Sequence, residues 1–142
     1  NAMALGVVPT GESELSLYLL ERYRLPSIRI RRLTLRTDGF VSLHAGWPQG
    51  EVITKPFIYR GSRLVVNYST SAAGNLRVEM LEAMGTSGAG RMLSESTEMF
   101  GDTINQRVPW KSGSEIDSSA GKAVRLRFIL KDGGLYSFRF VE

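Results

Sequence analysis

The sequence predicts an all-β protein with antiparallel sheets, arranged as a sandwich or a barrel, and three observations support this. Apolar and polar residues alternate with the period of two that is typical of strands, whereas the helical period of 3.6 never persists over about ten residues. Glycine and polar residues interrupt these segments at short intervals, as turns between strands do. The chain has 142 residues, of which 42% are hydrophobic and 23% are charged, and this composition suits one globular domain with one core.

Seven segments alternate clearly enough to be assigned as strands. In the first, leucines recur at every second position, and in the second, isoleucines and leucines alternate with arginines. The sixth contains the run Phe128-Ile129-Leu130, which is apolar on both faces and therefore suits the centre of a sheet. In chain order, the predicted strands are residues 15–23, 28–37, 40–45, 64–69, 75–81, 124–130 and 136–141.

Two Asp-Gly pairs predict hairpins. Asp38-Gly39 and Asp132-Gly133 can both supply the positive φ angles of tight turns, so the strands flanking each pair should be antiparallel neighbours. A break at residues 71–75 is also typical of a turn. Across the last hairpin the apolar residues would share one face and form core: Val124, Leu126, Phe128 and Leu130 with Tyr136, Phe138 and Phe140.

Two parts of the chain are not assigned to strands. Residues 1–3 are interpreted as the remnant of an expression tag, which leaves residues 4–142 as a single β-sandwich domain. Residues 84–110 combine several glycines with Ser, Thr and Glu and are expected to form a long loop. Such a loop could be functional or could be a crossover between two sheets.

The net charge of +4 raises the hypothesis of a nucleic-acid or other anionic partner. The 18 basic residues are dispersed, however, and the densest group alternates with apolar residues as the solvent face of a strand would. No aromatic RNA-binding signature is present. No apolar run approaches the roughly 20 residues of a spanning helix. The sequence therefore predicts neither a nucleic-acid nor a membrane partner.

The residue inventory leaves little room for catalysis. The chain has no cysteine and one histidine, His44, which excludes thiolate chemistry and every metal site that needs two imidazoles. Gly85-Thr86-Ser87-Gly88 lacks the spacing of a nucleophile elbow, and Gly88-Ala89-Gly90 lacks the third small residue of a dinucleotide fingerprint. We expect no catalytic residue, no cofactor and no metal site. The absence of cysteine leaves the compartment open, because many exported proteins also lack disulfides.

One acidic cluster, Glu95, Glu98 and Asp102, lies in the predicted loop. Three carboxylates among serines and threonines are typical of a solvated loop, and a weak calcium site is the alternative. Paired carboxylates for glycoside hydrolysis would have to face each other across a cleft. The sequence does not indicate such a cleft.

Sugar binding needs only an exposed aromatic ring beside polar side chains, and both tryptophans are candidates. Trp47 stands in the turn that follows His44, and Trp110 ends the irregular segment. The alternative for each tryptophan is that it closes one end of a sandwich core. His44 is expected to be a surface or interface histidine that could contact the sugar.

Several motifs resemble one known family. They are VPTG at 8–11, LRTDGFVSLHA at 35–45, TKPF at 54–57, NYSTSAAG at 67–74, FGD at 100–102, AGKAVRLRFILKD at 120–132 and LYSFRF at 135–140. Together they resemble the C-terminal β-sandwich of bacterial proteins related to glycoside hydrolase family 32, the invertase and inulinase type. The resemblance covers most of the chain, with departures at Gly133-Gly134 and at residues 82–85.

This resemblance implies a concanavalin A-like jelly roll of two antiparallel sheets. It also implies that the chain is the C-terminal fragment of a longer protein and packs on an upstream propeller domain, which holds the catalytic carboxylates of the family. The predicted function is therefore a non-catalytic accessory domain that supports that propeller. The alternative is a carbohydrate-binding module that uses Trp47, Trp110 and His44.

Overall fold

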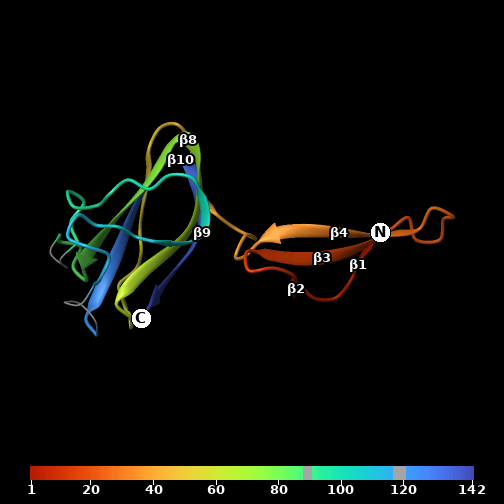
Figure 1. The fold of residues 1–142 in the computed structure, drawn as a ribbon, viewed down its shortest axis with the longest axis horizontal. Coiled ribbons are helices and arrows are strands. Elements are labelled where there is room, and N and C mark those ends of the chain that lie inside the picture. The colour runs from red at the N-terminus through yellow and green to blue at the C-terminus, as the bar shows by residue number, and fades with distance from the viewer. Residues whose placement is uncertain (88–90, 117–120) are drawn as a thin grey trace. The chain divides into compact units, whose positions relative to one another are not determined.

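The computed structural model describes residues 1–87, 91–116 and 121–142, and these contain strands and turns but no helix. The prediction of an all-β chain with two antiparallel sheets is confirmed, and the architecture is consistent with a β-sandwich (Figure 1). The jelly-roll topology stays a prediction, as does the assignment of residues 4–142 to one domain. The chain divides into two compact units, Asn1–Val41 and Ser42–Glu142. Within the described part of the chain, no helix could cross a membrane.

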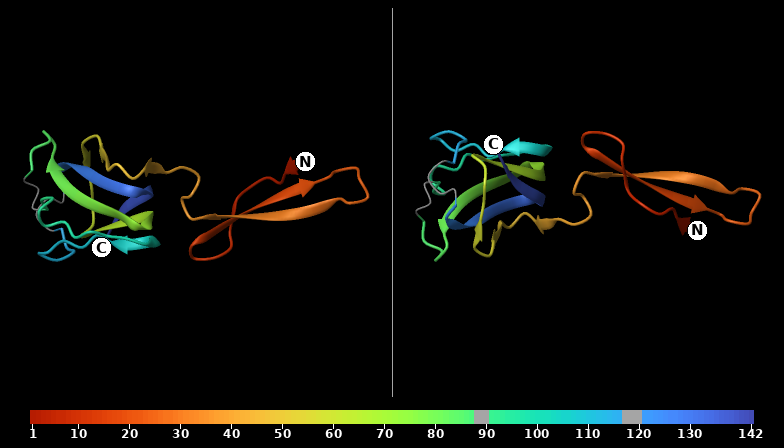
Figure 2. Two further views of the ribbon diagram at one scale, coloured as in Figure 1. Left: turned by 90° about the horizontal axis from the view of Figure 1, so that it is seen from above. Right: turned by 90° about the horizontal axis from the view of Figure 1, so that it is seen from below.

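The first unit is a small antiparallel sheet around the hairpin of β3 (Glu14–Glu21) and β4 (Arg29–Arg36), which Figure 2 shows from two sides. The short strands β1 (Ala2–Met3) and β2 (Val8–Pro9) both pair with the other edge of β3. The hairpin thus includes most of the first two predicted strands, and part of the suspected tag remnant pairs with it. Positive φ angles at two arginines end β3 earlier than predicted, 54° at Arg22 and 71° at Arg24.

The register of the hairpin collects leucines on one face, at the end away from the β3–β4 turn, whereas Glu21, Arg29 and Arg31 lie on the same face near that turn. Leu17 lies opposite Leu33, and Ser16 lies opposite Thr34. Because side chains alternate along a strand, five leucines share one face of β3 and β4. All five are only partly buried: Leu15, Leu17, Leu19, Leu33 and Leu35. We call this surface the leucine face.

The second unit is a six-stranded antiparallel sheet in the order β5-β10-β8-β9, in which β6 and β7 also pair with β10. Its long members are β8 (Arg63–Glu82) and β10 (Ala123–Val141), which pair along most of their length. The short strands are β5 (Leu43–Ala45), β6 (Gly50–Ile53), β7 (Phe57–Ile58) and β9 (Asp102–Arg107). The strands β6 and β7 were not predicted, and β9 lies inside the expected long loop. Of that loop, residues 88–90, including the Gly88-Ala89-Gly90 motif, lie outside the described residues.

The predicted hairpin at Asp132-Gly133 is wrong, and so is the predicted turn at residues 71–75. Both segments lie within continuous strands. The register runs from Lys131 opposite Asn75 directly to Gly133 opposite Thr70, so four residues of β8 bulge against one residue of β10. Asp132 does adopt a positive φ of 43°, but it uses this angle to bend a strand instead of reversing the chain.

We call the paired strands β8 and β10 the β8–β10 ribbon. The bend folds this ribbon so that its two halves pack on a single core. Leu64 and Val66 from one half of β8 and Val78 and Met80 from the other half are fully buried in the same cluster. Figure 1 shows both long strands curving through this bend. The folded ribbon therefore supplies the two faces that a sandwich packs together.

A second register shift, between Leu135 and Ser137, changes which residues of β10 enter the core. Leu135 is buried, whereas Phe138 is 37% exposed. The prediction that Tyr136, Phe138 and Phe140 share a core face with the first half of β10 is wrong for Tyr136, where the register shifts, whereas the Phe138 ring still packs on Phe128 with centroids 5.4 Å apart. Phe140 packs against the core and stacks on Tyr59 with ring centroids 4.1 Å apart.

The predicted hairpin at Asp38-Gly39 is also wrong. Asp38 has a positive φ of 58°, and the Gly39 N–H donates to the Arg36 carbonyl at 3.0 Å, so a turn does form. The strand that follows it is not the neighbour of β4, however. It is β5, which pairs with β10 at Gly133, Gly134 and Leu135. Local turn chemistry was predicted correctly, but the pairing partner was not.

Candidate functional site

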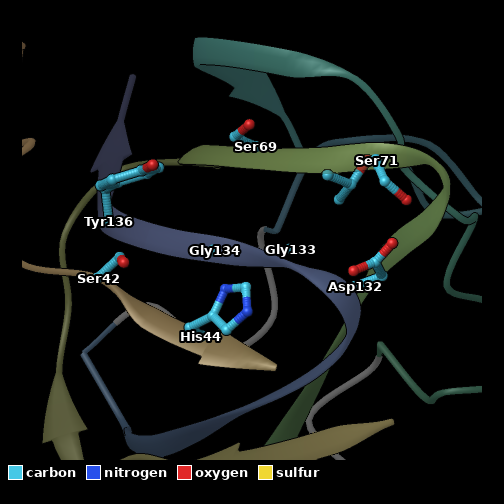
Figure 3. Close-up of a pocket in the computed structure, with 9 residues that line it drawn as sticks. Ser42, His44, Ser69, Ser71, Asp132, Gly133, Gly134 and Tyr136 are labelled. Carbon is cyan, nitrogen blue, oxygen red and sulfur yellow. The ribbon is translucent and has the colours of Figure 1, made fainter. Parts of the chain in front are cut away.

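A hollow of about 310 Å³ opens at the bend of the β8–β10 ribbon, where β5 pairs with β10 (Figure 3). Three segments that are far apart in the sequence meet there. The lining residues are Ser42 and His44 at β5, Ser69, Thr70 and Ser71 on β8, and Asp132, Gly133, Gly134 and Tyr136 on β10.

Two glycines leave the floor of the hollow without side chains. A Cβ atom at Gly133 would lie 2.5 Å from the Ser69 carbonyl oxygen, so the close pairing of β8 and β10 requires glycine there. A Cβ atom at Gly134 would lie 3.4 Å from Ser42 Oγ and 3.8 Å from Tyr136 Cε2, which are ordinary contact distances. The first glycine is needed for the fold, and the second keeps the floor open.

His44 and Asp132 flank this floor. The strand register places His44 opposite Gly134, and Figure 3 shows the imidazole beside the bare ribbon and the carboxylate at the bend. Neither the imidazole nor the carboxylate has a hydrogen-bond or ion-pair partner among the described residues. Two groups that bind hydroxyls well therefore face the same space and are available to a ligand.

The hydroxyl groups of the hollow differ in what they already bind. Thr70 Oγ1 accepts a hydrogen bond from the Gly101 N–H at 3.0 Å, and Ser71 Oγ accepts one from the Ala73 N–H at 3.2 Å. A hydroxyl that accepts one hydrogen bond can still donate its own hydrogen. The hollow can thus both donate to and accept from a polyhydroxylated ligand.

Trp47 is not one of the residues that line the hollow, but it follows β5 by two residues and is 62% exposed. Its turn is tied to the bend because the Asp132 N–H donates to the Gly46 carbonyl at 2.9 Å. Lys131 Nζ lies 4.1 Å from the centroid of the indole ring, a cation–π contact that helps to hold the ring. The structure therefore places His44 opposite Gly134 and the Trp47 ring against Lys131, three residues apart on β10.

Trp110 is not part of this site, and its place as an exposed sugar-binding residue is corrected. It is 3% exposed and belongs to the core cluster. Its indole Nε1–H donates to the Val78 carbonyl at 3.2 Å, which satisfies the one polar group of the ring. Trp110 therefore follows the alternative stated above for it, a tryptophan that completes the core.

The site does not have the geometry of a nucleophilic centre. Of the residues that the structure describes, none of the three serines in the hollow makes a hydrogen bond to His44, although a serine nucleophile needs a base within that reach. The acidic residues of the expected loop are also dispersed. Glu95 accepts a hydrogen bond from Ser112 Oγ at 3.0 Å, and Asp102 begins β9. No group of three potential metal ligands occurs within residues 1–87, 91–116 and 121–142.

Sequence reasoning missed most of the residues that line the hollow. Asp132 and Gly133 were assigned to a turn, Tyr136 to the core and Ser71 to a break between strands. One signal was present: two glycines inside an otherwise apolar β-pattern indicate a bulge or a close approach of backbone.

Comparisons of the chain with protein-family models, with curated proteins and with solved structures find no match.

Proposed function

We propose that this chain is a non-catalytic accessory β-sandwich of a larger glycoside hydrolase-like protein, and that its first unit docks on a further domain of the same polypeptide. The observation that carries the proposal is the leucine face. The motif resemblance supplies the identity of the neighbour, an upstream propeller domain.

The leucine face supports docking because a sheet with one apolar face needs a second layer against that face. Every fully buried apolar side chain among the described residues lies in Ser42–Glu142, and Ser16 is the buried residue of β3. Each Å² of apolar surface that leaves water contributes about 25 cal/mol, so covering five leucines would stabilise the hairpin by several kcal/mol. A small sheet without such cover is marginally stable.

Amide hydrogen exchange tests this proposal, measured on the 142-residue chain and on the polypeptide as its gene encodes it. We expect β3 and β4 to exchange at least about tenfold more slowly in the longer polypeptide, because docking adds to the local free energy of opening. Leu17→Ser with Leu33→Ser should remove the difference. Thr34→Ala, on the opposite face, should leave it unchanged. Equal exchange in the two polypeptides would contradict docking.

Carbohydrate binding is the second candidate function, and the exposed Trp47 beside the polar hollow favours it. Aromatic rings pack against the apolar face of a sugar, while hydroxyl-binding side chains orient it. A glycan-array screen that includes fructans and plant and algal polysaccharides tests this function. We expect binding that Trp47→Ala abolishes. If the folded chain binds no glycan on the array, carbohydrate binding is excluded and the accessory role is the one proposed function that remains.

A further inference from the structure

We infer that the hollow at the β8–β10 bend binds a single neutral sugar residue, which Asp132 and His44 hold by its hydroxyls and Trp47 packs against. This inference rests on the proposed carbohydrate-binding function. It adds the subsite, the groups that recognise the ligand and the charge class of the ligand.

The size of the hollow limits the ligand to a small one. Its volume of about 310 Å³ is at the lower end of the range of roughly 300–1,000 Å³ for small-molecule sites. The rim is polar, and the floor is bare backbone at Gly133 and Gly134. A flat, polar ring fits such a surface better than a bulky apolar group, which would leave the carboxylate and the imidazole without partners.

The charges of the hollow favour a neutral sugar. Asp132 is the one acidic residue among its lining residues, and no lysine or arginine lines it. Lys131, the residue before Asp132, does not line the hollow and contacts the Trp47 ring. A uronic acid or a sulfated sugar would bring its negative charge to Asp132 with no lysine or arginine in the lining to compensate it, whereas the hydroxyls of a neutral sugar can donate to the carboxylate.

Lys131 and Trp47 together define how the sugar would pack. The ammonium group covers one face of the indole, so the ring offers its other face to a ligand. The hydrogen bond between the Asp132 N–H and the Gly46 carbonyl keeps the Trp47 turn next to the backbone of Asp132. One sugar ring can then pack on Trp47 while its hydroxyls reach the hollow.

The composition of the chain supplies built-in reporters for this site. His44 is the only histidine, so its ring protons give one set of signals in an NMR spectrum. The two tryptophans give two indole N–H signals, and the buried Trp110 serves as an internal control for Trp47. The probes are the methyl glycosides of glucose, mannose, galactose and fructose, compared with those of glucuronic and galacturonic acid.

We expect at least one neutral methyl glycoside to shift the His44 and Trp47 signals while the Trp110 signal stays in place. Asp132→Asn should weaken binding at least about tenfold, because it removes the charge-assisted hydrogen bonds. Asparagine also tolerates a positive φ, so the bend should be kept. Gly134→Ala should weaken binding by placing a methyl group on the floor. Glu98→Gln, which changes an exposed carboxylate outside the hollow, is the matched control and should bind as the unchanged chain does.

The other outcomes separate the inference from the function on which it rests. Equal or tighter binding of the uronic acid glycosides would overturn the neutral ligand class and leave carbohydrate binding in place. Shifts at Trp47 without shifts at His44, together with full binding by Asp132→Asn, would overturn the hollow as the subsite. If no glycoside and no array glycan binds the folded chain, both proposals fail.

Discussion

Trp47 and Trp110 show how the same side chain serves two purposes in one molecule. Trp110 follows β9 and the buried Val108, and its indole fills core volume and donates a hydrogen bond to the Val78 carbonyl. Trp47 stands in a turn and keeps its ring in solvent. The two environments predict very different costs for removing the ring.

We expect Trp110→Ala to lower the free energy of unfolding by about 3–5 kcal/mol, because it opens a large cavity and leaves a buried carbonyl without its donor. Trp47→Ala should cost less than about 1 kcal/mol, since the ring is exposed. Urea unfolding followed by far-UV circular dichroism measures both values. Similar losses of unfolding free energy in the two variants would show that the Trp47 ring stabilises the fold.

Tyr68 provides a prediction about alkaline pH. Burial raises the pKa of its hydroxyl above the usual 10.0, and the hydroxyl donates to the Phe100 carbonyl at 3.1 Å. Because the folded chain favours the neutral form, this contribution to stability is fully present below about pH 10 and is lost as the pH rises through the raised pKa.

The urea midpoint of the unchanged chain should therefore fall more steeply above pH 10 than that of Tyr68→Phe, which has no hydroxyl to ionise. Other groups titrate in the same range in both proteins, so the difference between the two curves isolates Tyr68. Parallel curves would mean that Tyr68 ionises without cost in the folded chain.

At the scale of elements, the bend of the β8–β10 ribbon decides the architecture of the second unit. It replaces the predicted hairpin at Asp132-Gly133 and the predicted turn at residues 71–75 with two long strands, and the hollow lies at the same bend. Gly74 and Gly133 make this bend possible, because a Cβ atom at either position would lie within 2.5 Å of a carbonyl oxygen of the partner strand. Backbone atoms cannot move away from such a contact without separating the strands.

Gly133→Ala should destabilise the chain by about 1–3 kcal/mol through this overlap. Gly134→Ala should be tolerated within about 0.5 kcal/mol, because its new methyl group meets only ordinary contacts. The two glycines are adjacent in the same strand, so the pair is matched for position and composition. Thermal unfolding of both variants checks the difference, and equal losses would show that the whole floor is under strain.

At the scale of the whole molecule, the positive charge is partly neutralised where it is densest. Arg29 and Arg31 both pair with Glu21, at 2.7 Å and 3.2 Å, and Arg32 pairs with Glu14. The hydrogen bond from Arg29 and the positive charges nearby hold the pKa of Glu21 below its usual 4.5. Three arginines of β4 therefore pair with acids of β3, Arg29 and Arg31 on the face of the leucines and Arg32 on the opposite face.

This charge balance predicts little affinity for nucleic acid. We expect no measurable binding of the chain to duplex DNA or to RNA in low-salt buffer, as followed by fluorescence anisotropy. Binding that weakens steeply with added salt would instead indicate several phosphate contacts and would favour the anion-binding hypothesis.

The distribution of the core predicts which part of the chain determines stability. The buried apolar residues of the described chain all lie in Ser42–Glu142. We expect residues 42–142 alone to unfold cooperatively, with a urea midpoint close to that of the whole chain. Failure of this shorter chain to fold would show that the first unit contributes to the stability of the core.

The sequence by itself determined the class of the protein and much of its local geometry. Alternation of apolar and polar residues specifies strands because the side-chain period of a strand is two. Asp38 and Asp132 adopt the positive φ angles that their Asp-Gly context indicated. The strands β3 and β4 were both predicted from this alternation, although their pairing with each other was not.

Only the tertiary structure decided what those angles do and which strands pair. A positive φ allows either a reversal or a bulge, and the choice at Asp132 depends on β8, which lies more than fifty residues away in the chain. The burial of Trp110, the pairing of β5 with β10 and the hollow around Gly134 depend on the same long-range contacts. Local sequence cannot encode these features alone, because each exists only after distant segments have packed together.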